Sequence, residues 1–542
     1  MNNTRLAFPR PTNEPIKGYL PGSPERIALE AELKRQSSEE IEIPMIIGGK
    51  EVRTGNMGKV VMPHNHQHVL AQYHKAGEKE VAMAIEAGLK AKKEWENMQW
   101  EDRAAIFLRI AESLSKRNRA RINAATMLGQ SKNAFQAEID SSCEATDFIR
   151  FNNYYASQIY SDQPHSADGQ FNMVEYRPLE GFLFAITPFN FTAIASNLNL
   201  SAALFGNVTL WKPATTSLLS NYHLMKIYQE AGLPDGVVNF VPGQGSTLSK
   251  VALAHRDFAG IHFTGSTGTF NTLWRNVAEN LPKYASYPKL VGETGGKDFV
   301  FVHESACALE VATAIVKGAF EYQGQKCSAA SRAYIPKSLW NDVKNHITNM
   351  LSTIKMGEVS DFNNFINAVI DEASFDNIKA FVDRAKASSE CKIIAGGKCD
   401  KSVGYYIEPT VVETTNPHYE LMTTEIFGPV ICVYVYNENE YEKTLELCDT
   451  SSPYALTGAV FAYDTKALHL AIDKLRYTAG NFYINDKPTG AVVGMQPFGG
   501  SRASGTNDKA GGMTNLIRWV NPRTIKENYS PDKEYGYGYM NK

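Results

Sequence analysis

Short, fully apolar runs alternate with helical patterns in the first half of the chain. Two of these runs, 181–186 and 207–211, are typical of strands buried on both faces of a parallel sheet. The segment between them, 192–204, has helical spacing, and further strand-like runs at 236–241 and 260–264 each follow a helical segment. This recurrence predicts a doubly wound α/β sheet.

The pattern starts again after a glycine pair at 295–296, where we place a second α/β domain. The other predicted elements are helices at 78–89, 103–128, 218–231 and 309–322, and strands at 298–302 and 333–335.

Ser, Asp, Gln, Pro and Gly cluster at 160–169, before an alternating run at 171–176. This pattern predicts an extended hairpin that projects from the main body. The Gly-rich segment 497–542 has only a short strand-like stretch at 517–520, so we expect it to pack on another element or subunit.

Composition and charge narrow the class of protein. The chain has 542 residues, 43% of them hydrophobic and 21% charged, which is typical of a water-soluble protein with a large core. Because 55 basic residues nearly balance 58 acidic ones, we expect no attraction to nucleic acid or to an anionic membrane. The most apolar long window, 181–211, contains Pro188 and several Asn residues, which favours buried core over a membrane span.

The cysteines and the N-terminal segment indicate the cellular compartment of the protein. The seven cysteines are far apart and form no CxxC pair, which is typical of a reducing compartment. Segment 1–22 is Pro-rich, has no apolar run suited to a signal peptide, and is too poor in Arg for an organelle presequence. We therefore expect the protein to be located in the cytoplasm.

One cysteine is the candidate nucleophile. Cys327 follows Gly324-Gln-Lys, where a predicted helix is followed by a strand. A tight connection of this kind can present a side chain in a cleft. The neighbouring Lys326 and backbone dipoles could lower the pKa of the thiol. The alternative is an inert, buried cysteine.

Two further residues could assist it. In Glu293-Thr-Gly-Gly-Lys297 the glycines let the backbone turn beside a carboxylate that could take a proton from water. The alternative is a solvated turn with an ion pair to Lys297. Asn190 comes just after the strand 181–186, at the sheet edge where ligands collect, and its amide could stabilise an oxyanion. It could equally cap the next helix.

A dinucleotide could bind at the same edge. Segment 265–269 follows a predicted strand and opens a predicted helix, so its amides and hydroxyls could face a phosphate, although it lacks the GxGxxG pattern. Lys212 adds a cation at the end of the adjacent strand, where it could reach ribose hydroxyls.

Seven motifs together occur in the order and spacing of the aldehyde dehydrogenase superfamily, which the chain resembles. They are Pro188-Phe-Asn-Phe191, Trp211-Lys-Pro213, Phe263-Thr-Gly-Ser266, Glu293-Thr-Gly-Gly-Lys297, Gly324-Gln-Lys-Cys327, Glu425-Ile-Phe-Gly-Pro429 and Pro497-Phe-Gly-Gly500. More narrowly, segments 320–329, 480–487 and 500–508 resemble the delta-1-pyrroline-5-carboxylate dehydrogenase (glutamate-semialdehyde dehydrogenase) family. The likeness runs from about residue 13 to the C-terminus.

The resemblance implies a fold and an assembly. It implies a discontinuous Rossmann-like NAD-binding domain at 1–158 and 178–291 and an α/β catalytic domain at 292–495. A small β oligomerisation element at 159–177 and 496–542 would join a homodimer or a higher homo-oligomer.

The resemblance also implies a reaction, the oxidation of L-glutamate 5-semialdehyde to L-glutamate with NAD, the second step of proline degradation. Cys327 would attack the aldehyde, Asn190 and the Cys327 N–H would stabilise the oxyanion, and hydride would pass to the nicotinamide. Glu293 would then activate water to hydrolyse the thioester. No metal is needed, and a proline dehydrogenase would be the metabolic neighbour. Bacterial members are cytosolic and eukaryotic ones lie in the mitochondrial matrix.

The site residues implied by the resemblance fall into two sets. The cofactor set is Thr187, Pro188, Phe189, Lys212, Gly265, Ser266, Thr267, Gly268, Thr269, Glu425 and Phe427, and the substrate set is Phe191, Lys326, Ser328, Gly490, Ala491 and Phe498. Many family members have Ser at the position of Ala491, so carboxylate binding must depend on main-chain N–H groups and Ser328. The Glu that often follows the Lys-Pro pair is absent at 214–216, so the preference for NAD over NADP rests on the resemblance.

Other interpretations remain open. His64, His66 and His68 alternate at metal-ligand spacing, although a structural role is favoured. A non-catalytic relative would be expected to lose Cys327 or Glu293, and both are present. A cysteine hydrolase needs a His beside the thiolate, and none lies near the motifs in sequence. Glu293 argues against a CoA-acylating dehydrogenase.

Overall fold

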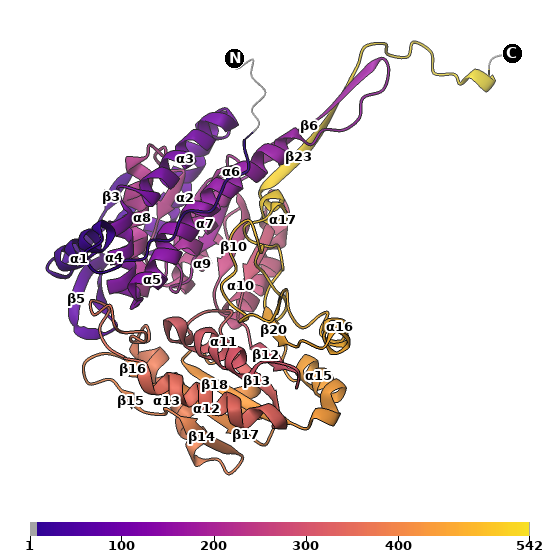
Figure 1. Cartoon of the computed structure of the whole chain (residues 1–542). Helices are drawn as coiled ribbons and strands as arrows, with labels where there is room; N and C mark the ends of the chain where they lie inside the picture. The colour runs from indigo at the N-terminus through magenta and orange to yellow at the C-terminus, as the bar shows by residue number, and fades with distance from the viewer. Residues whose placement is uncertain (1–7, 541–542) are drawn as a thin grey trace.

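Two seven-stranded sheets form the centres of two layered α/β bodies in this computed structural model, which describes residues 8–540. Figure 1 shows the body built mainly from the first half of the chain above the body built from the second half. A two-stranded ribbon projects away from both of them. The predicted α/β class with two such units is confirmed.

The first sheet has the strand order β11-β10-β7-β8-β9-β2-β3. Its strands are β2 (Met45–Ile47), β3 (Lys50–Val52), β7 (Phe182–Ile186), β8 (Thr209–Lys212), β9 (Val238–Phe240), β10 (Phe258–Thr264) and β11 (Lys289–Glu293). The five strands from β7 to β11 are parallel, and β2 joins β9 in antiparallel orientation. Because β8 and β10 flank β7 on opposite sides, the order reverses beside β7, where open α/β sheets bind ligands.

Helices cover this sheet as the apolar periodicity predicts. They are α1 (Pro24–Ser37), α2 (Glu78–Trp95), α3 (Trp100–Ser115), α4 (Arg119–Gln130), α5 (Ala134–Ala137), the π-helix η1 (Glu138–Glu144), α6 (Ala145–Ser161), α7 (Thr192–Ala203), α8 (Leu218–Glu230), α9 (Gly245–Ala252) and α10 (Thr267–Asn280). Short 3-10 turns η2 (Thr215–Ser217) and η3 (Leu281–Lys283) join some of them. A small sheet of β1 (Ile41–Ile43), β5 (Asn65–His74) and β4 (Met57–Met62) lies beside them.

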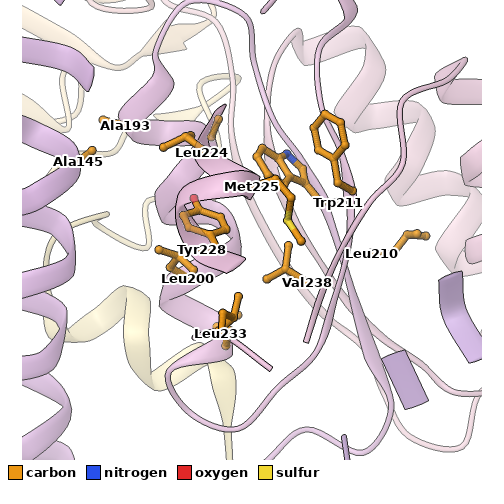
Figure 2. Packing of buried hydrophobic residues seen from close by; sticks show 14 of the residues in the cluster. Ala145, Ala193, Leu200, Leu210, Trp211, Leu224, Met225, Tyr228, Leu233 and Val238 are labelled. Atoms are coloured by element: carbon orange, nitrogen blue, oxygen red, sulfur yellow. The ribbon is translucent and has the colours of Figure 1, made fainter. Parts of the chain in front are cut away.

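The packing of α8 on β8 and β9 fixes the sheet edge that carries the candidate residues. Figure 2 shows Met225 and Tyr228 from α8 near Trp211 and Val238 from the strands. The Trp211 ring lies 6.3 Å from the Tyr228 ring, centroid to centroid, and both side chains are fully buried. Burial of such large rings stabilises the layer by several kcal/mol, on the order of 2 kcal/mol for each side chain.

The second sheet has the order β14-β17-β18-β13-β12-β20-β21. Its strands are β12 (Asp298–Val302), β13 (Ala330–Pro336), β14 (Cys391–Ala395), β17 (Thr410–Thr414), β18 (Val430–Tyr436), β20 (Thr457–Phe461) and β21 (Asn481–Ile484). Its helices are α11 (Ala308–Phe320), η4 (Glu321–Gly324), α12 (Lys337–Thr353), α13 (Glu372–Ala387), α14 (Glu420–Thr423), η5 (Glu438–Glu440), α15 (Tyr441–Thr450) and α16 (Thr465–Lys474). Two small pairs, β15 (Cys399–Asp400) with β16 (Tyr406–Ile407) and β19 (Tyr454–Ala455) with β22 (Ser501–Arg502), lie outside it.

The projecting ribbon corrects one prediction. The run at 171–176 does extend from the body, but β6 (Gln170–Pro178) pairs with β23 (Val520–Asn528) instead of closing a hairpin on itself. The chain reaches β23 through α17 (Met513–Leu516) and η6 (Ile517–Trp519), and η7 (Gly538–Met540) follows it. The strand predicted at 517–520 is therefore mostly wrong, since a 3-10 turn places the buried Trp519 ring 4.5 Å from His262.

A second correction concerns the helix predicted at 103–128. The chain breaks it at residues 116–118, where Lys116 has φ −124° and ψ −94°. The break allows α4 to begin at Arg119, whose buried guanidinium pairs with Glu138. Within the described residues, no helix is both long and apolar enough to cross a membrane.

Candidate active site

Cys327 lies at a strained connection between α11 and β13. Tyr322, Gln323 and Gly324 all adopt left-handed φ values, 52°, 54° and 65°. A Cβ at Gly324 would lie 2.2 Å from the Gly428 carbonyl oxygen, so only glycine fits.

The buried Gln323 amide holds this turn, since it donates to the carbonyl oxygens of Ser131 and Ala368 at 3.0 and 2.8 Å. Its oxygen accepts from Asn367 N at 3.0 Å. Strain of this kind persists where the surroundings fix the backbone, and here it sets the position of the thiol.

The thiol meets a carboxylate. Cys327 Sγ donates to Glu293 Oε1 over 3.4 Å, although the two residues come from opposite bodies. Burial, followed by the nearby Glu293 charge, raises the pKa of Cys327 well above its ordinary value. The expected lowering by Lys326 is therefore wrong, because the Lys326 ammonium pairs with Glu321 at 3.0 Å.

Glu293 ends β11 and is suited to proton transfer. Burial raises its pKa to about 7, against opposing contributions from the Cys327 hydrogen bond and the Lys509 charge. A carboxyl group with this pKa can hold or release a proton near neutral pH. Glu293 forms no ion pair with Lys297, whose buried amine has no partner among the described residues, so the solvated-turn alternative is wrong.

The glycine pair after Glu293 permits two close approaches. A Cβ at Gly295 would lie 2.2 Å from Glu425 Oε2, and one at Gly296 would lie 2.4 Å from the Cys327 carbonyl oxygen. Gly296 N also donates to Glu425 Oε1 over 2.9 Å. The two glycines therefore bring Glu293, Cys327 and Glu425 to one place.

Asn190 faces the cysteine turn. Its Nδ2 donates to the Gln325 carbonyl oxygen over 3.1 Å, which leaves one of the two amide hydrogens free. The Cys327 backbone N–H also donates to no described group. Two unengaged donors beside the thiol could receive an oxyanion. The capping alternative is wrong, since Phe191 is the N-cap residue of α7 and its first N–H groups donate to Asp140.

The predicted cofactor residues gather along the carboxyl ends of β7, β8 and β10. Thr187 follows β7 and accepts from Trp211 Nε1 over 2.9 Å, while Lys212 ends β8. Ser266 caps α10, and Gly265 N donates to the Glu293 carbonyl oxygen over 3.1 Å. Pro188 lies in the connection after β7, and Thr267, Gly268 and Thr269 form the first turn of α10.

Lys212 on this edge and Glu425 of the second body are two polar groups that could bind a cofactor. Burial alone lowers the pKa of the Lys212 amine, and no charged or hydrogen-bonding neighbour offsets it within the described chain. Glu425 engages Gly296 N through Oε1. An unpaired amine and a carboxylate oxygen fit the hydroxyl groups of a dinucleotide ribose. Phe427, at φ 59°, sets its ring edge-on to Phe189 at 5.8 Å, so the two bodies meet across these rings.

The predicted substrate residues line one cavity together with Cys327 and Glu293, the predicted catalytic pair. Its walls include Cys327, Glu293 and the whole predicted substrate set, Phe191, Lys326, Ser328, Gly490, Ala491 and Phe498. The Ser328 hydroxyl bonds to that of Thr489 at 2.8 Å, which fixes the start of loop 489–496. The backbone N–H groups of Gly490 and Ala491 donate to no described group. Free amides of this kind suit a carboxylate.

Glu144 is a cavity residue that the sequence analysis missed. It ends the π-helix η1, lines the cavity, and is partly buried. Burial, and then the charge of Asp140, raises its pKa to about 8, and no hydrogen bond offsets this shift. No motif marks this residue. The only signal would be the π-turn register, which apolar periodicity does not reveal.

Of the alternating histidines, His66 contacts the second body and His64 is buried. His66 Nε2 lies 2.9 Å from the Lys401 carbonyl oxygen, and its ring stacks on Tyr405 at 5.0 Å. His64 is buried, which lowers its pKa to about 4. Both rings therefore make packing contacts.

Comparison with known proteins places this arrangement among relatives. The model of the aldehyde dehydrogenase family matches residues 52–525. The chain is 49% identical over 539 residues, 99% of this chain and 97% of the other, to the mitochondrial delta-1-pyrroline-5-carboxylate dehydrogenase of Dictyostelium discoideum. It is 48% identical over 529 residues, 97% and 94% of the two chains, to the human mitochondrial enzyme of the same name. A crystal structure of the Mycobacterium tuberculosis delta-pyrroline-5-carboxylate dehydrogenase bound with NAD is similar over 100% of both chains, with 47% identity and a TM-score of 0.96.

Proposed function

The chain belongs to the aldehyde dehydrogenase family, and from this we propose that it oxidises L-glutamate 5-semialdehyde to L-glutamate with NAD. The substrate is the open form of delta-1-pyrroline-5-carboxylate, and the reaction is the second step of proline degradation. The observation that carries the proposal is the Cys327–Glu293 contact of 3.4 Å in a cavity whose other end has free amides at Gly490 and Ala491.

The reaction begins at the sulfur atom. The Cys327 thiol passes its proton to Glu293, to which it already donates, and the sulfur bonds to the aldehyde carbon. The aldehyde oxygen becomes an oxyanion that accepts from Asn190 Nδ2 and from the Cys327 N–H. When bound, NAD supplies the acceptor for the hydride that leaves this carbon.

Hydrolysis then releases the acid. Glu293 first releases to solvent the proton that it took from the thiol. It then takes a proton from water as the water oxygen attacks the thioester carbon, the carbon–sulfur bond breaks, and the leaving thiolate takes this proton from Glu293. The product gives its remaining proton to solvent and leaves as a carboxylate. Thr187, Lys212, the 265–269 segment, Glu425 and Phe427 are the groups that would hold the dinucleotide.

The substrate is oriented by both of its charged groups. Its carboxylate accepts from the amides of Gly490 and Ala491, with the Ser328 hydroxyl nearby, which compensates for the absent serine hydroxyl at position 491. Phe191 and Phe498 flank the aliphatic chain. We assign its ammonium to Glu144, which lines the cavity, because pairing with a positive charge would favour the ionised carboxylate.

A panel of three aldehydes tests the proposal under both nicotinamide dinucleotides. L-Glutamate 5-semialdehyde carries both charged groups, 5-oxopentanoate lacks the ammonium, and pentanal lacks both. We expect kcat/KM to fall at least about tenfold at each removal, because each lost charged contact is worth on the order of 1.5–3 kcal/mol. Equal turnover of all three aldehydes, or of succinate semialdehyde and the proposed substrate, would contradict it.

Asn190→Ala tests the oxyanion role. We expect kcat to fall about a hundredfold, because one of two donors to the developing charge is lost. The binding of NAD, measured by fluorescence quenching, should be unchanged, since Asn190 is assigned to the aldehyde oxygen. An unchanged kcat would exclude the role.

In the ribbon of β6 and β23, the outer edge of β23 pairs with no other strand among the described residues, whereas the Gln163 and Ser166 side chains bond to the outer edge of β6 at Val174 and Asn172. An isolated two-stranded ribbon is only marginally stable in water. We propose that it pairs with a second copy of the chain to give a homodimer or a larger assembly, which sedimentation of the intact chain tests. We also propose three domains: an NAD-binding domain at 1–158 and 178–291, a catalytic domain at 292–495, and an oligomerisation element at 159–177 and 496–542.

We further propose a cytoplasmic location, which cell fractionation tests, and a proline dehydrogenase as the enzyme that supplies the substrate.

A further inference from the structure

The segment before α1 crosses the outside of the cavity without forming a helix or strand. This N-terminal strap, residues 8–22, places Asn13, Glu14 and Ile16 in the cavity wall. It is held at both ends. The Phe8 ring packs against Trp100 at 5.4 Å, and the buried Tyr19 hydroxyl donates to Glu138 Oε2 over 2.7 Å.

A network of charges fastens the middle of the strap. Glu14 pairs with Arg119 and with Arg150, each at 2.7 Å, and Glu14 N donates to Asp147 Oδ1 over 2.8 Å. Lys17 N donates to Glu138 Oε1 over 2.7 Å. The strap is therefore joined to η1, which carries Glu144, and to α6, which follows it.

Asn13 links these elements to loop 489–496. Both hydrogens of its amide are engaged, since Nδ2 donates to Asp147 Oδ2 and to the Val493 carbonyl oxygen, each over 2.8 Å. Asn13 is partly buried, so water competes little with either bond. A side chain with a single donor could not make both contacts.

Near Val493 the loop is held by packing, since the Val493 side chain is buried and Gly494 lies against the Phe151 ring, but it has few other hydrogen bonds to the rest of the described chain. It turns on itself at 492–496, where Met495 N and Gln496 N donate to the Val492 carbonyl oxygen at 3.0 Å. Beyond that, the exposed Arg10 reaches the Gly494 carbonyl oxygen only at 3.4 Å. Among the described residues, Asn13 therefore makes the shortest side-chain hydrogen bond from outside the loop to its backbone, two residues after the free amide of Ala491.

We propose that Asn13 is a positioning residue for aldehyde selectivity, because it holds loop 489–496 where the Gly490 and Ala491 amides converge on the substrate carboxylate. The inference rests on the proposed function, which assigns the carboxylate to those amides. Asn13 acts through the loop and is distant in sequence from the residues that carry out the reaction.

Asn13→Ala gives the first test. We expect KM for L-glutamate 5-semialdehyde to rise about tenfold, with kcat and the kcat/KM for pentanal each unchanged within about twofold. Amide hydrogen exchange within 489–496 should become faster. Should this variant fail to fold, Asn13→Ser keeps one donor and should give an intermediate KM.

Exchanging the carboxylate and the amide between positions 13 and 147 distinguishes an effect on the position of the loop from an effect on stability. Asn13→Asp removes both donors and sets two carboxylates together, so both the melting temperature and the affinity for the substrate should fall. Adding Asp147→Asn restores a hydrogen bond between the two side chains and the melting temperature. It cannot restore the bond to Val493, so KM should stay raised.

The control is Tyr19→Phe, which removes the hydrogen bond to Glu138 outside the cavity. We expect a lower melting temperature and an unchanged KM. The inference is overturned if Tyr19→Phe raises KM as Asn13→Ala does, if the swap restores KM, or if Asn13→Ala affects pentanal equally. A parent enzyme that does not prefer the carboxylated aldehyde over pentanal would instead reject the proposed function.

Discussion

Replacing Cys327 by alanine is expected to abolish the formation of reduced nicotinamide, with a fall in kcat of about 10⁴-fold or more. Among the described residues, Cys327 is the thiol that lines the cavity beside Glu293, and it follows a strained turn that the Gln323 amide holds. Cys143 also lines the cavity, but it lies against Arg119 and Glu138, and burial raises its pKa strongly. It cannot substitute for Cys327.

A matched control is Cys327→Ser, which keeps a hydroxyl at the same place. Because a serine hydroxyl is far less acidic than a thiol and Glu293 has a pKa of only about 7, this variant should be nearly as inactive. Both variants should bind NAD and melt like the parent. Substantial oxidation by folded Cys327→Ala would show that the aldehyde is oxidised without a covalent intermediate.

The central strands were predicted well, because an apolar run alone indicates a strand that is buried on both faces. The structure places β12 at Asp298–Val302, the predicted range, and β7, β8 and β10 within two residues of theirs. All four are parallel strands inside a sheet, where both faces are buried and most positions are apolar.

Long-range pairing was not predictable from local pattern. An alternating run such as 171–176 shows that one face is apolar but does not name its partner, and β23 lies some 340 residues later in the chain. The break between α3 and α4 has the same origin, since it serves the burial of Arg119 against Glu138.

The active site likewise contains residues that the sequence could identify and residues that it could not. Motif resemblance named Cys327, Glu293 and Asn190, and the structure brings them together from both bodies. Glu144 and Asn13 carry no motif. Their places follow from a π-turn and from an irregular strap, two features without periodicity.

Glu293→Gln should separate the two halves of the reaction. The amide cannot take a proton from water, so thioester hydrolysis should slow about a thousandfold, while thioester formation slows less. With 5-oxopentanoate we expect one reduced nicotinamide per site in a fast phase, followed by a stalled steady state. That substrate is chosen because it has no amine to attack the thioester from within. Mass spectrometry should find the acyl group on Cys327.

The pH profile of the parent enzyme gives a second measure. Hydrolysis needs ionised Glu293, so its rate should rise with pH through about 7 and then level, and Glu293→Gln should lose this rise. A profile that falls through pH 7 would contradict the base role. An equal loss of the fast and steady phases, with no acyl-enzyme, would confine Glu293 to the first half-reaction.

The melting temperature of Glu293→Gln shows whether this variant is inactive because it is misfolded. Burial raises the pKa of Glu293 from 4.5 to about 7, so the folded state binds this proton more tightly than the unfolded chain does. The resulting stabilisation is present below pH 4.5 and is lost as pH rises through 7. A neutral glutamine avoids that loss, so the melting temperature of Glu293→Gln relative to the parent should increase from pH 5 to pH 8. An inactive variant that gains stability at pH 8 would show that the parent enzyme keeps a buried charge at a cost in stability because hydrolysis requires it.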